Sequence, residues 1–196
     1  MKKILGILVL ILFTLQTPSQ ADDIRDFQIE GMSVGDSLLD YFSKKEIKDN
    51  TSINYYTNNK YTSVEFFGLL AFKIYDTVGF HYKTDDKKYI IDAIRGVLFC
   101  EKNIEKCNKK QKEIDLELSK MFKKSQREVE KGKHSADKSG KSTFSHINFW
   151  LISGDAVNIE LIDWSEKITN EKGWTDNVNV SFRTKEFNDF LGIAFK

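Results

Sequence analysis

The sequence predicts an α+β protein: an antiparallel sheet, or two sheets, with helices packed on one side. Aromatic and β-branched runs typical of strands gather in two groups of three, over residues 61–99 and 144–182. A stretch with helical spacing precedes each group, and a short helix follows the second. Because strands cluster with strands instead of alternating singly with helices, the pattern favours the α+β class.

The chain is expected to form a single domain over residues 22–196. Removing a 21-residue leader from 196 residues leaves 175, a length that can bury one sizeable core. The order of helix and then three strands also allows two helix-plus-three-strand units, with halves 22–100 and 101–196. The halves do not align residue by residue, so a duplication is a hypothesis about architecture.

The first 21 residues predict a secretory signal peptide. A cationic start precedes an apolar run over residues 4–15, and small Ser19 and Ala21 stand three and one places before the expected cut. A membrane anchor is the alternative, but a bilayer core takes about 20 apolar residues, and a polar, proline-containing segment follows too soon. We therefore expect cleavage before Asp22, a periplasmic or secreted protein, and no membrane span afterwards.

Charge is nearly balanced in the expected mature chain. Loss of Lys2 and Lys3 reduces 30 Lys and Arg to 28, against 29 Asp and Glu, for a formal net charge of −1. This balance argues against a nucleic-acid partner. Residues 108–141 nevertheless carry eleven Lys or Arg against six acids. A solvated helix and loop would explain that excess, and a basic platform for an anionic ligand is the alternative.

The first helical region is expected to be broken. Ser33 with Asp36 three residues later, and Ser43 with Glu46, each have the form of a capping box, and apolar residues between 38 and 42 supply a short helical face.

A three-strand antiparallel meander should follow the first helical region. Strands are predicted over residues 61–67, 72–82 and 89–99, with a turn at residues 84–87.

Cys100 and Cys107 are expected to form a disulfide, since export would place them in an oxidising compartment. On one continuous helix their Cα atoms would lie roughly 10 Å apart, beyond the ~7 Å that a disulfide can span, so the chain must turn between them. The bond is therefore predicted to tie the end of a strand, residues 94–99, to a first helical turn at 106–109. A redox or metal site is the alternative, but the C-x-x-C spacing is missing and no histidine lies nearby.

An amphipathic helix is predicted over residues 106–130, because apolar residues from Ile114 to Phe122 recur at helical spacing among charged ones. A polar loop over residues 132–142 should follow.

The last part of the chain predicts strands over residues 144–152, 157–162 and 178–182, with Ser153-Gly154-Asp155 as a hairpin connection. Thr184 is expected to cap a short helix over residues 187–190.

Two pairs of residues are candidate binding contacts. Lys138 and Lys141 lie in a segment that ends Gly-Lys-Ser, as a nucleotide-binding loop does, but the segment lacks the first glycine of that motif. The remaining hypothesis is a less specific anion-binding site formed by the two lysines and nearby backbone amides. Trp164 and Trp174 flank a polar stretch, and exposed tryptophans there could bind sugars or partner proteins. For most aromatic residues of the chain, packing in the hydrophobic core is the alternative to binding.

The sequence favours binding over catalysis. None of the three histidines has a second histidine at metal-site spacing, so no metal, cofactor or catalytic residue is assigned. The expected function is an exported, non-catalytic binding or assembly module, with an envelope protein or an anionic envelope ligand as its partner. An exported hydrolase in which residues such as His146 and Asp163 converge is the alternative, and a purely structural or storage role is a third.

Residues 26–43, which begin Asp26-Phe27-Gln28-Ile29, resemble the start of a group of uncharacterised exported proteins from streamlined, AT-rich marine alphaproteobacteria. Residues 163–165 and 184–187 look like later members of the same pattern. This resemblance covers most of the mature chain and implies no activity. Residues 31–33, Gly-Met-Ser, are also similar to the opening of β-lactamase-inhibitor-like and outer-membrane assembly lipoprotein modules, which implies a helix-plus-sheet module that binds proteins.

Overall fold

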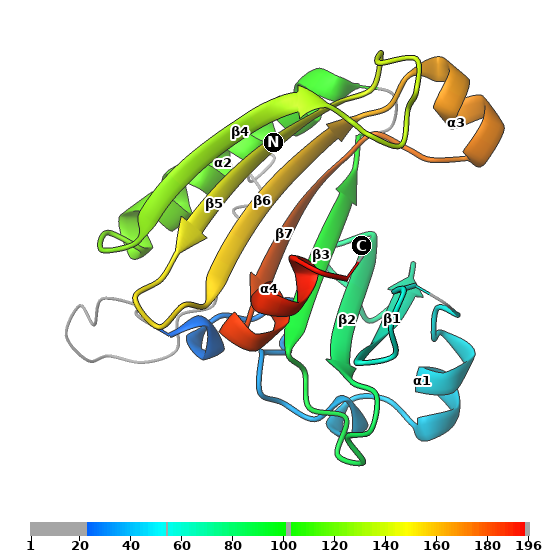
Figure 1. Cartoon of the computed structure of the whole chain (residues 1–196), viewed down its shortest axis with the longest axis vertical. Coiled ribbons are helices and arrows are strands. Elements are labelled where there is room, and N and C mark those ends of the chain that lie inside the picture. The colour runs from blue at the N-terminus through cyan, green and yellow to red at the C-terminus, as the bar shows by residue number, and fades with distance from the viewer. Residues whose placement is uncertain (1–22, 54, 101–102, 195–196) are drawn as a thin grey trace, which may run out of the picture.

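The computed structural model describes residues 23–53, 55–100 and 103–194, so the predicted signal peptide lies outside the described residues. In that part of the chain, seven strands form one antiparallel sheet in the order β1-β2-β3-β7-β6-β5-β4 (Figure 1). The predicted α+β class is confirmed. The strands are β1 (Tyr61–Phe67), β2 (Thr77–Lys83), β3 (Ala93–Phe99), β4 (Gln126–Lys133), β5 (Thr143–Trp150), β6 (Ala156–Asp163) and β7 (Asn177–Arg183). The helices are α1 (Lys44–Asp49), α2 (Ile104–Met121), α3 (Glu166–Lys172) and α4 (Lys185–Leu191), with short 3-10 turns η1 (Ile24–Asp26) and η2 (Leu38–Asp40).

The pairing of β3 with β7 joins the two halves of the chain in one sheet. Strands β1 to β3 form one meander and β4 to β7 a second, and the register between them runs from Ala93 opposite Arg183 to Phe99 opposite Asn177. α2 carries the chain from the end of β3 to the edge strand β4, and the second meander then returns to β3. A duplication of the two halves stays a hypothesis.

The second group of strands has four members, where the sequence predicted three. Residues 126–130 were predicted as the end of a helix, but α2 ends at Met121, and its capping residue Phe122 has a non-helical ψ of 52°. The next strand, β4, is exposed along almost its whole length. Because neither face of this edge strand is buried, its sequence lacks the apolar alternation that marks a strand. Its charged side chains discourage pairing with other chains.

One face of the sheet is apolar and carries the main core. Successive strand residues point to opposite faces, and on this face Phe80, Ile94 and Ile159 are among the fully buried side chains. α2 lies against β6 and β7 on this side and contributes Ile114 and Leu118 to the core. α1 and the segment before it pack on the same face through their own apolar residues.

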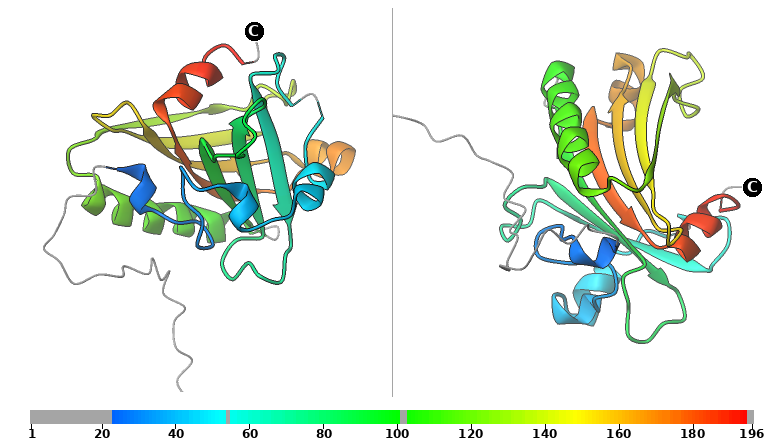
Figure 2. Two further views of the ribbon diagram at one scale, coloured as in Figure 1. Left: turned by 90° about the horizontal axis from the view of Figure 1, so that it is seen from below. Right: turned by 90° about the vertical axis from the view of Figure 1, so that its left-hand side faces the viewer.

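α4 packs on the opposite face of the sheet, as both views in Figure 2 show. The predicted cap is confirmed, because the side chain of Thr184 accepts the Phe187 N–H. Phe187 and Phe190 bury themselves against Tyr61 and Ala93 in a second, smaller core. α4 therefore covers the end of this face where β1 begins and β7 ends.

Two predicted strands begin later than expected, at residues 77 and 93 in place of 72 and 89. The Glu30 carboxylate accepts the backbone N–H groups of residues 73, 74 and 75, which holds this segment as a loop. Tyr89 has a φ of 54°, in the left-handed region that a strand does not use.

The two predicted helix starts at the N-terminus have different outcomes. Ser43 and Glu46 do form a capping box and begin α1. The start at Ser33 is wrong, because Gly35 has a φ of 94° and the chain makes only the short turn η2 further on.

α3 was not predicted from the sequence, although Ser165 caps its first turn and Gly173 ends it in the left-handed conformation.

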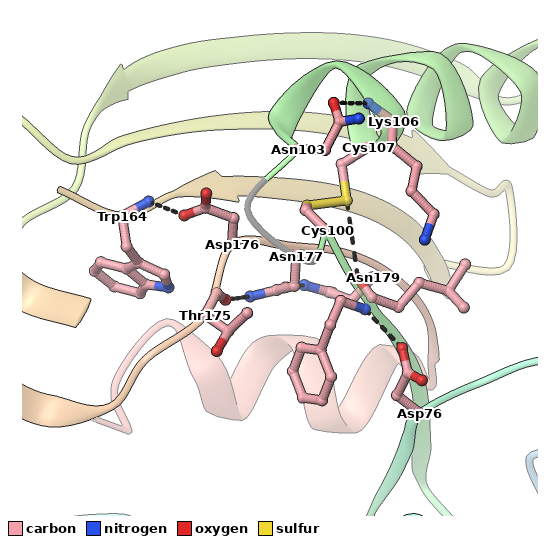
Figure 3. Close-up of a disulfide and its surroundings, with 12 residues drawn as sticks. Asp76, Cys100, Asn103, Lys106, Cys107, Trp164, Thr175, Asp176, Asn177 and Asn179 are labelled. Atoms are coloured by element: carbon pink, nitrogen blue, oxygen red, sulfur yellow. Dashed lines mark hydrogen bonds between the residues drawn. A yellow bond between two sulfur atoms is a disulfide. The ribbon is translucent and has the colours of Figure 1, made fainter. Parts of the chain in front are cut away.

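The predicted disulfide between Cys100 and Cys107 is confirmed, with Cα atoms 5.5 Å apart. Figure 3 shows the bond linking the end of β3 to the first turns of α2. Asn103 caps the helix between them by accepting the Lys106 N–H. The chain turns between the two cysteines, as their spacing required.

Replacing both cysteines with alanine should lower the free energy of unfolding by about 2 to 3 kcal/mol, because the short covalent loop no longer restricts the unfolded chain. Urea unfolding of wild type and of the Cys100→Ala, Cys107→Ala variant measures the difference. Reductant should shift the wild-type midpoint and leave the variant unchanged. Equal midpoints for the two oxidised proteins would show that the disulfide contributes nothing.

Candidate functional site

The face of the sheet opposite α2 is polar across its central strands, and we call it the polar face. Sheet register aligns these side chains, since residues directly opposite each other on neighbouring strands share a face. The polar side chains of this face include Ser63, Glu65, Thr77, His81, Arg95, His146, Asn148, Asn158, Glu160, Asn177, Asn179, Ser181 and Arg183.

Hydrogen bonds tie most of these groups into pairs. Arg95 Nη2 donates to Glu65 Oε1 at 2.8 Å. His146 Nε2 lies 2.6 Å from Glu160 Oε1, and Asn179 Nδ2 donates to the other oxygen of Glu160 at 3.0 Å. Burial alone would raise the pKa of Glu160, but the hydrogen bonds from His146 and Asn179 outweigh burial and lower it. Glu160 is therefore held as a carboxylate on this face.

A cleft of about 340 Å³ opens on the polar face at the end away from α4. It combines aromatic surface with hydrogen-bonding groups, a mixture that suits a small-molecule or oligomeric ligand. Its aromatic lining residues are Phe67, Phe99, Trp164 and Trp174, and its polar lining residues include Glu65, Arg95, Asn177 and Asn179.

Both predicted tryptophans line this cleft. The ring centroids of Trp164 and Trp174 lie 4.6 Å apart, and Lys172 Nζ sits 4.4 Å from the centroid of the Trp174 ring. Trp174 is 38% exposed, so much of its indole faces solvent. The two rings form one continuous aromatic surface at the mouth of the cleft.

The disulfide end of the sheet positions this aromatic surface. Asp176 Oδ1 accepts the Trp164 N–H at 2.7 Å (Figure 3). The Asp176 backbone carbonyl accepts the Cys100 N–H at 2.8 Å. Asp176 therefore links the segment that carries Trp164 to the cross-linked end of β3.

Lys138 and Lys141 are exposed on the loop between β4 and β5 and do not line the cleft. Asp137 organises this loop. Its carboxylate accepts hydrogen bonds from Ser139, Ser142 and Ser165, and those from Ser139 and Ser142 do most to hold the pKa of Asp137 well below its usual range.

The β4–β5 loop borders the aromatic surface. The centroid of the His134 ring, in this loop, lies 4.3 Å from the centroid of the Trp164 ring. The structure thus brings the loop that carries the two candidate lysines beside the tryptophans, at the rim of the cleft.

The hydrolase alternative required His146 to converge with Asp163, but the histidines have other partners. His146 pairs with Glu160, and alternation along β6 turns Asp163 to the other face, so His146 and Asp163 do not converge. The His81 Nδ1 pairs with the Tyr56 hydroxyl, and the His134 Nδ1 accepts the Ala136 N–H.

The described part of the chain contains no cluster of His, Cys, Asp or Glu able to hold a metal ion. No helix among the same residues is long and apolar enough to cross a bilayer.

Sequence patterns alone did not single out Arg95, Glu160, Asn179 and Arg183 on the polar face, of which Arg95 and Asn179 line the cleft. The alternation Asn177-Val-Asn-Val-Ser-Phe-Arg183 in β7 did indicate a strand with one polar face. The sequence around Arg95 gave a weaker signal, because Arg95 is the single charged residue in an otherwise apolar strand. Their proximity depends on the register of β3 with β7, which the sequence does not contain.

His81 should make the protein less stable in mild acid. Its pKa is lowered to about 3 by burial, with a smaller effect from Arg95 and Arg183. In the unfolded chain the pKa is ordinary, near 6.5. Below about pH 6.5 His81 is protonated in the unfolded state but stays neutral in the folded state. The free energy of unfolding should therefore fall by about 2 kcal/mol between pH 7 and pH 5.

His81→Gln, which stays neutral at both pH values, should show a smaller fall by about that amount. Chemical denaturation of both proteins at each pH gives the comparison. The same pH dependence in wild type and variant would rule out His81 as its source.

Comparisons with known proteins give no match: no family model fits the chain, and neither curated proteins nor solved structures are similar to it. The resemblance to exported alphaproteobacterial proteins and the weaker one to lipoprotein modules therefore stay predictions from the sequence.

Proposed function

We propose that the protein is an exported, non-catalytic binding module that holds an envelope ligand in the cleft of the polar face. The pattern of the first 21 residues supports export to the periplasm or beyond, and the Cys100–Cys107 disulfide is compatible with an oxidising compartment. The observation that carries the proposal is the cleft, where the paired rings of Trp164 and Trp174 meet a guanidinium and two amides.

A saccharide chain is the ligand that fits this cleft best. An exposed indole offers an apolar surface to the face of a sugar ring, with its polar edge free for hydrogen bonds. The guanidinium of Arg95 and the amides of Asn177 and Asn179 supply donors and acceptors for hydroxyl groups. The volume of about 340 Å³ lies in the range of small-ligand sites, about 300–1,000 Å³. Lys138 and Lys141 are candidate contacts at the rim.

A partner protein is the second candidate, and exposed apolar side chains near the cleft favour it. Phe67, which lines the cleft, is 63% exposed, and Leu70 in the following loop is fully exposed. Exposed apolar surface of this kind is common where proteins dock. Under this alternative the module would serve in assembly, and the cleft would receive part of the partner.

The groups on the polar face favour binding over hydrolysis. The three histidines pair with Glu160, Tyr56 and a backbone amide. A hydrolytic site of the serine type would instead need a histidine bonded to a nucleophilic hydroxyl.

Trp174→Ala should weaken saccharide binding at least tenfold, because it removes the exposed half of the aromatic surface. The measurement is calorimetric titration of the full exported chain with a panel of glucan, chitin and uronic-acid oligosaccharides and their methyl esters. Leu116→Ala, which trims an exposed apolar side chain on α2, is the matched control and should bind as wild type does.

If no saccharide in the panel binds, or if Trp174→Ala binds as well as wild type, the saccharide proposal is wrong. An envelope protein that binds wild type but not Trp174→Ala would then assign the cleft to protein docking.

A further inference from the structure

All three tryptophans of the chain lie on the polar face or at its end. Trp164 and Trp174 form the aromatic surface at the mouth of the cleft, and Trp150 is the last residue of β5. Trp150 stands opposite Ala156, which stands opposite Arg183, so the register places the Trp150 side chain on the polar face. Each of the three indoles is at least partly exposed. Large aromatic side chains that remain in contact with water on one face indicate a binding surface.

Aromatic rings join the mouth of the cleft to strand β5. The His134 ring lies beside Trp164, with centroids 4.3 Å apart, and its centroid is 6.4 Å from that of Phe144 near the start of β5. The Phe144 ring in turn lies 4.5 Å from the ring of His146, between centroids. All four side chains are partly exposed. An unbroken series of rings therefore leaves the cleft and continues over β5.

The series continues along β5 to Trp150. Because every second residue of a strand points to the same face, the row from Phe144 to Trp150 spans about 20 Å between its end Cα atoms. Asn148 stands in this row, and its Oδ1 accepts the Asn158 amide at 2.8 Å, which leaves the Asn148 amide nitrogen to donate to a ligand. The residues of this path, which we call the aromatic track, are Trp174, Trp164, His134, Phe144, His146, Asn148 and Trp150.

Neighbouring residues hold both ends of the β5 row in place. Gly132 stands opposite Phe144 on β4, and a Cβ at residue 132 would come within 3.0 Å of the Phe144 ring. The ring can therefore lie over the backbone of the edge strand because a glycine stands there. At the other end, Trp150 Nε1 donates to Glu128 Oε2 at 2.8 Å. Rings that are already positioned lose less conformational entropy when a ligand binds.

The described helices leave this row open. α2 packs against β6 and β7 on the other face of the sheet, and α4 covers the end of the polar face where β1 begins and β7 ends (Figure 1). A long ligand can therefore run from the cleft onto β5 without displacing a helix.

The charge beside the β5 row is negative. The side chains that β4 and β6 place on the polar face include Glu128, Glu130 and Glu160. None of the polar-face positions on β4, β5 and β6 is Lys or Arg, because the basic residues of β4 alternate onto the other face. Like charges placed side by side weaken binding. This part of the face therefore suits sugar rings without negative charge.

We propose that the aromatic track extends the cleft into a site for a long polysaccharide chain that carries no negative charge. This inference rests on the proposed function, since the cleft would hold one segment of the chain while the β5 row holds the next. Sugar rings on the same chain bind the second segment of the site as an intramolecular step. Affinity should therefore increase with chain length until the chain reaches Trp150.

The first test follows affinity against chain length. The full exported chain is titrated calorimetrically with glucan and chitin oligosaccharides from the trisaccharide to the octasaccharide. In at least one series the octasaccharide should bind wild type tenfold or more tightly than the trisaccharide. Trp150→Ala should remove most of that gain and leave trisaccharide binding unchanged. Val129→Ala, which trims an exposed apolar side chain on the other face of β4, is the matched control and should bind as wild type does.

The charge of the ligand is tested with octasaccharides of uronic acids. These should bind wild type at least tenfold more weakly than the best neutral octasaccharide. Glu130→Gln removes one of the acids beside the β5 row, so it should strengthen uronic-acid binding and leave neutral binding unchanged. Glu117→Gln, which removes an acid from α2, is the matched control and should leave both affinities unchanged.

The second test uses wild type alone. The indole N–H groups of the three tryptophans give separate NMR signals. The trisaccharide should shift only the signals of Trp164 and Trp174, whereas the octasaccharide should also shift that of Trp150. An octasaccharide that binds without moving the Trp150 signal would overturn the inference.

The outcomes distinguish this inference from the proposed function. Equal affinity at every chain length, lost in Trp174→Ala, would keep the saccharide cleft and overturn the aromatic track as part of the site. Tighter binding of a uronic-acid octasaccharide than of every neutral one would also overturn the inference. Binding of none of these ligands would overturn both.

Discussion

The pairing of β3 with β7 is the interaction on which the rest of this structure depends. Two meanders, built from opposite halves of the chain, become one sheet only along this seam. The register places Arg95 opposite Ser181 and Ile94 opposite Phe182, so polar side chains meet on one face and apolar ones on the other. A slip of one residue would turn Phe182 toward solvent and Arg183 toward the core, which makes the register strongly specified. The disulfide fixes the end of the seam where α2 departs.

The two faces of the sheet contribute differently to the free energy of folding. The apolar face buries its strands under α2 and the N-terminal segment. The polar face instead keeps two guanidiniums close together and leaves buried donors without partners. Each buried donor without a partner, such as the Nε of Arg95 and of Arg183, costs free energy of folding.

The cleft draws its walls from segments far apart in the sequence. Phe67 ends β1, Phe99 ends β3, and the tryptophans flank α3, yet all line one opening. Asp176 and Asp137 act as local organisers, since each accepts hydrogen bonds from two segments and so fixes one wall against the next. Through these hydrogen bonds Asp176 and Asp137 hold the segments next to the aromatic surface in place.

The sequence by itself determined what depends on local spacing: the α+β class, the disulfide, and the helix starts at Ser43 and Thr184. It failed where tertiary contacts override local pattern. β4 has no apolar face, and its first residues were therefore predicted as part of a helix. The aromatic run that begins at residue 72 was predicted as a strand, but hydrogen bonds to the Glu30 carboxylate hold its start as a loop. Only the tertiary structure decided that His146 pairs with Glu160 and not with Asp163, and that Arg183 lies diagonally across from Arg95. Strand alternation fixes which residues share a face within one strand, whereas neighbours across strands follow from pairing and register, which a single sequence does not encode locally.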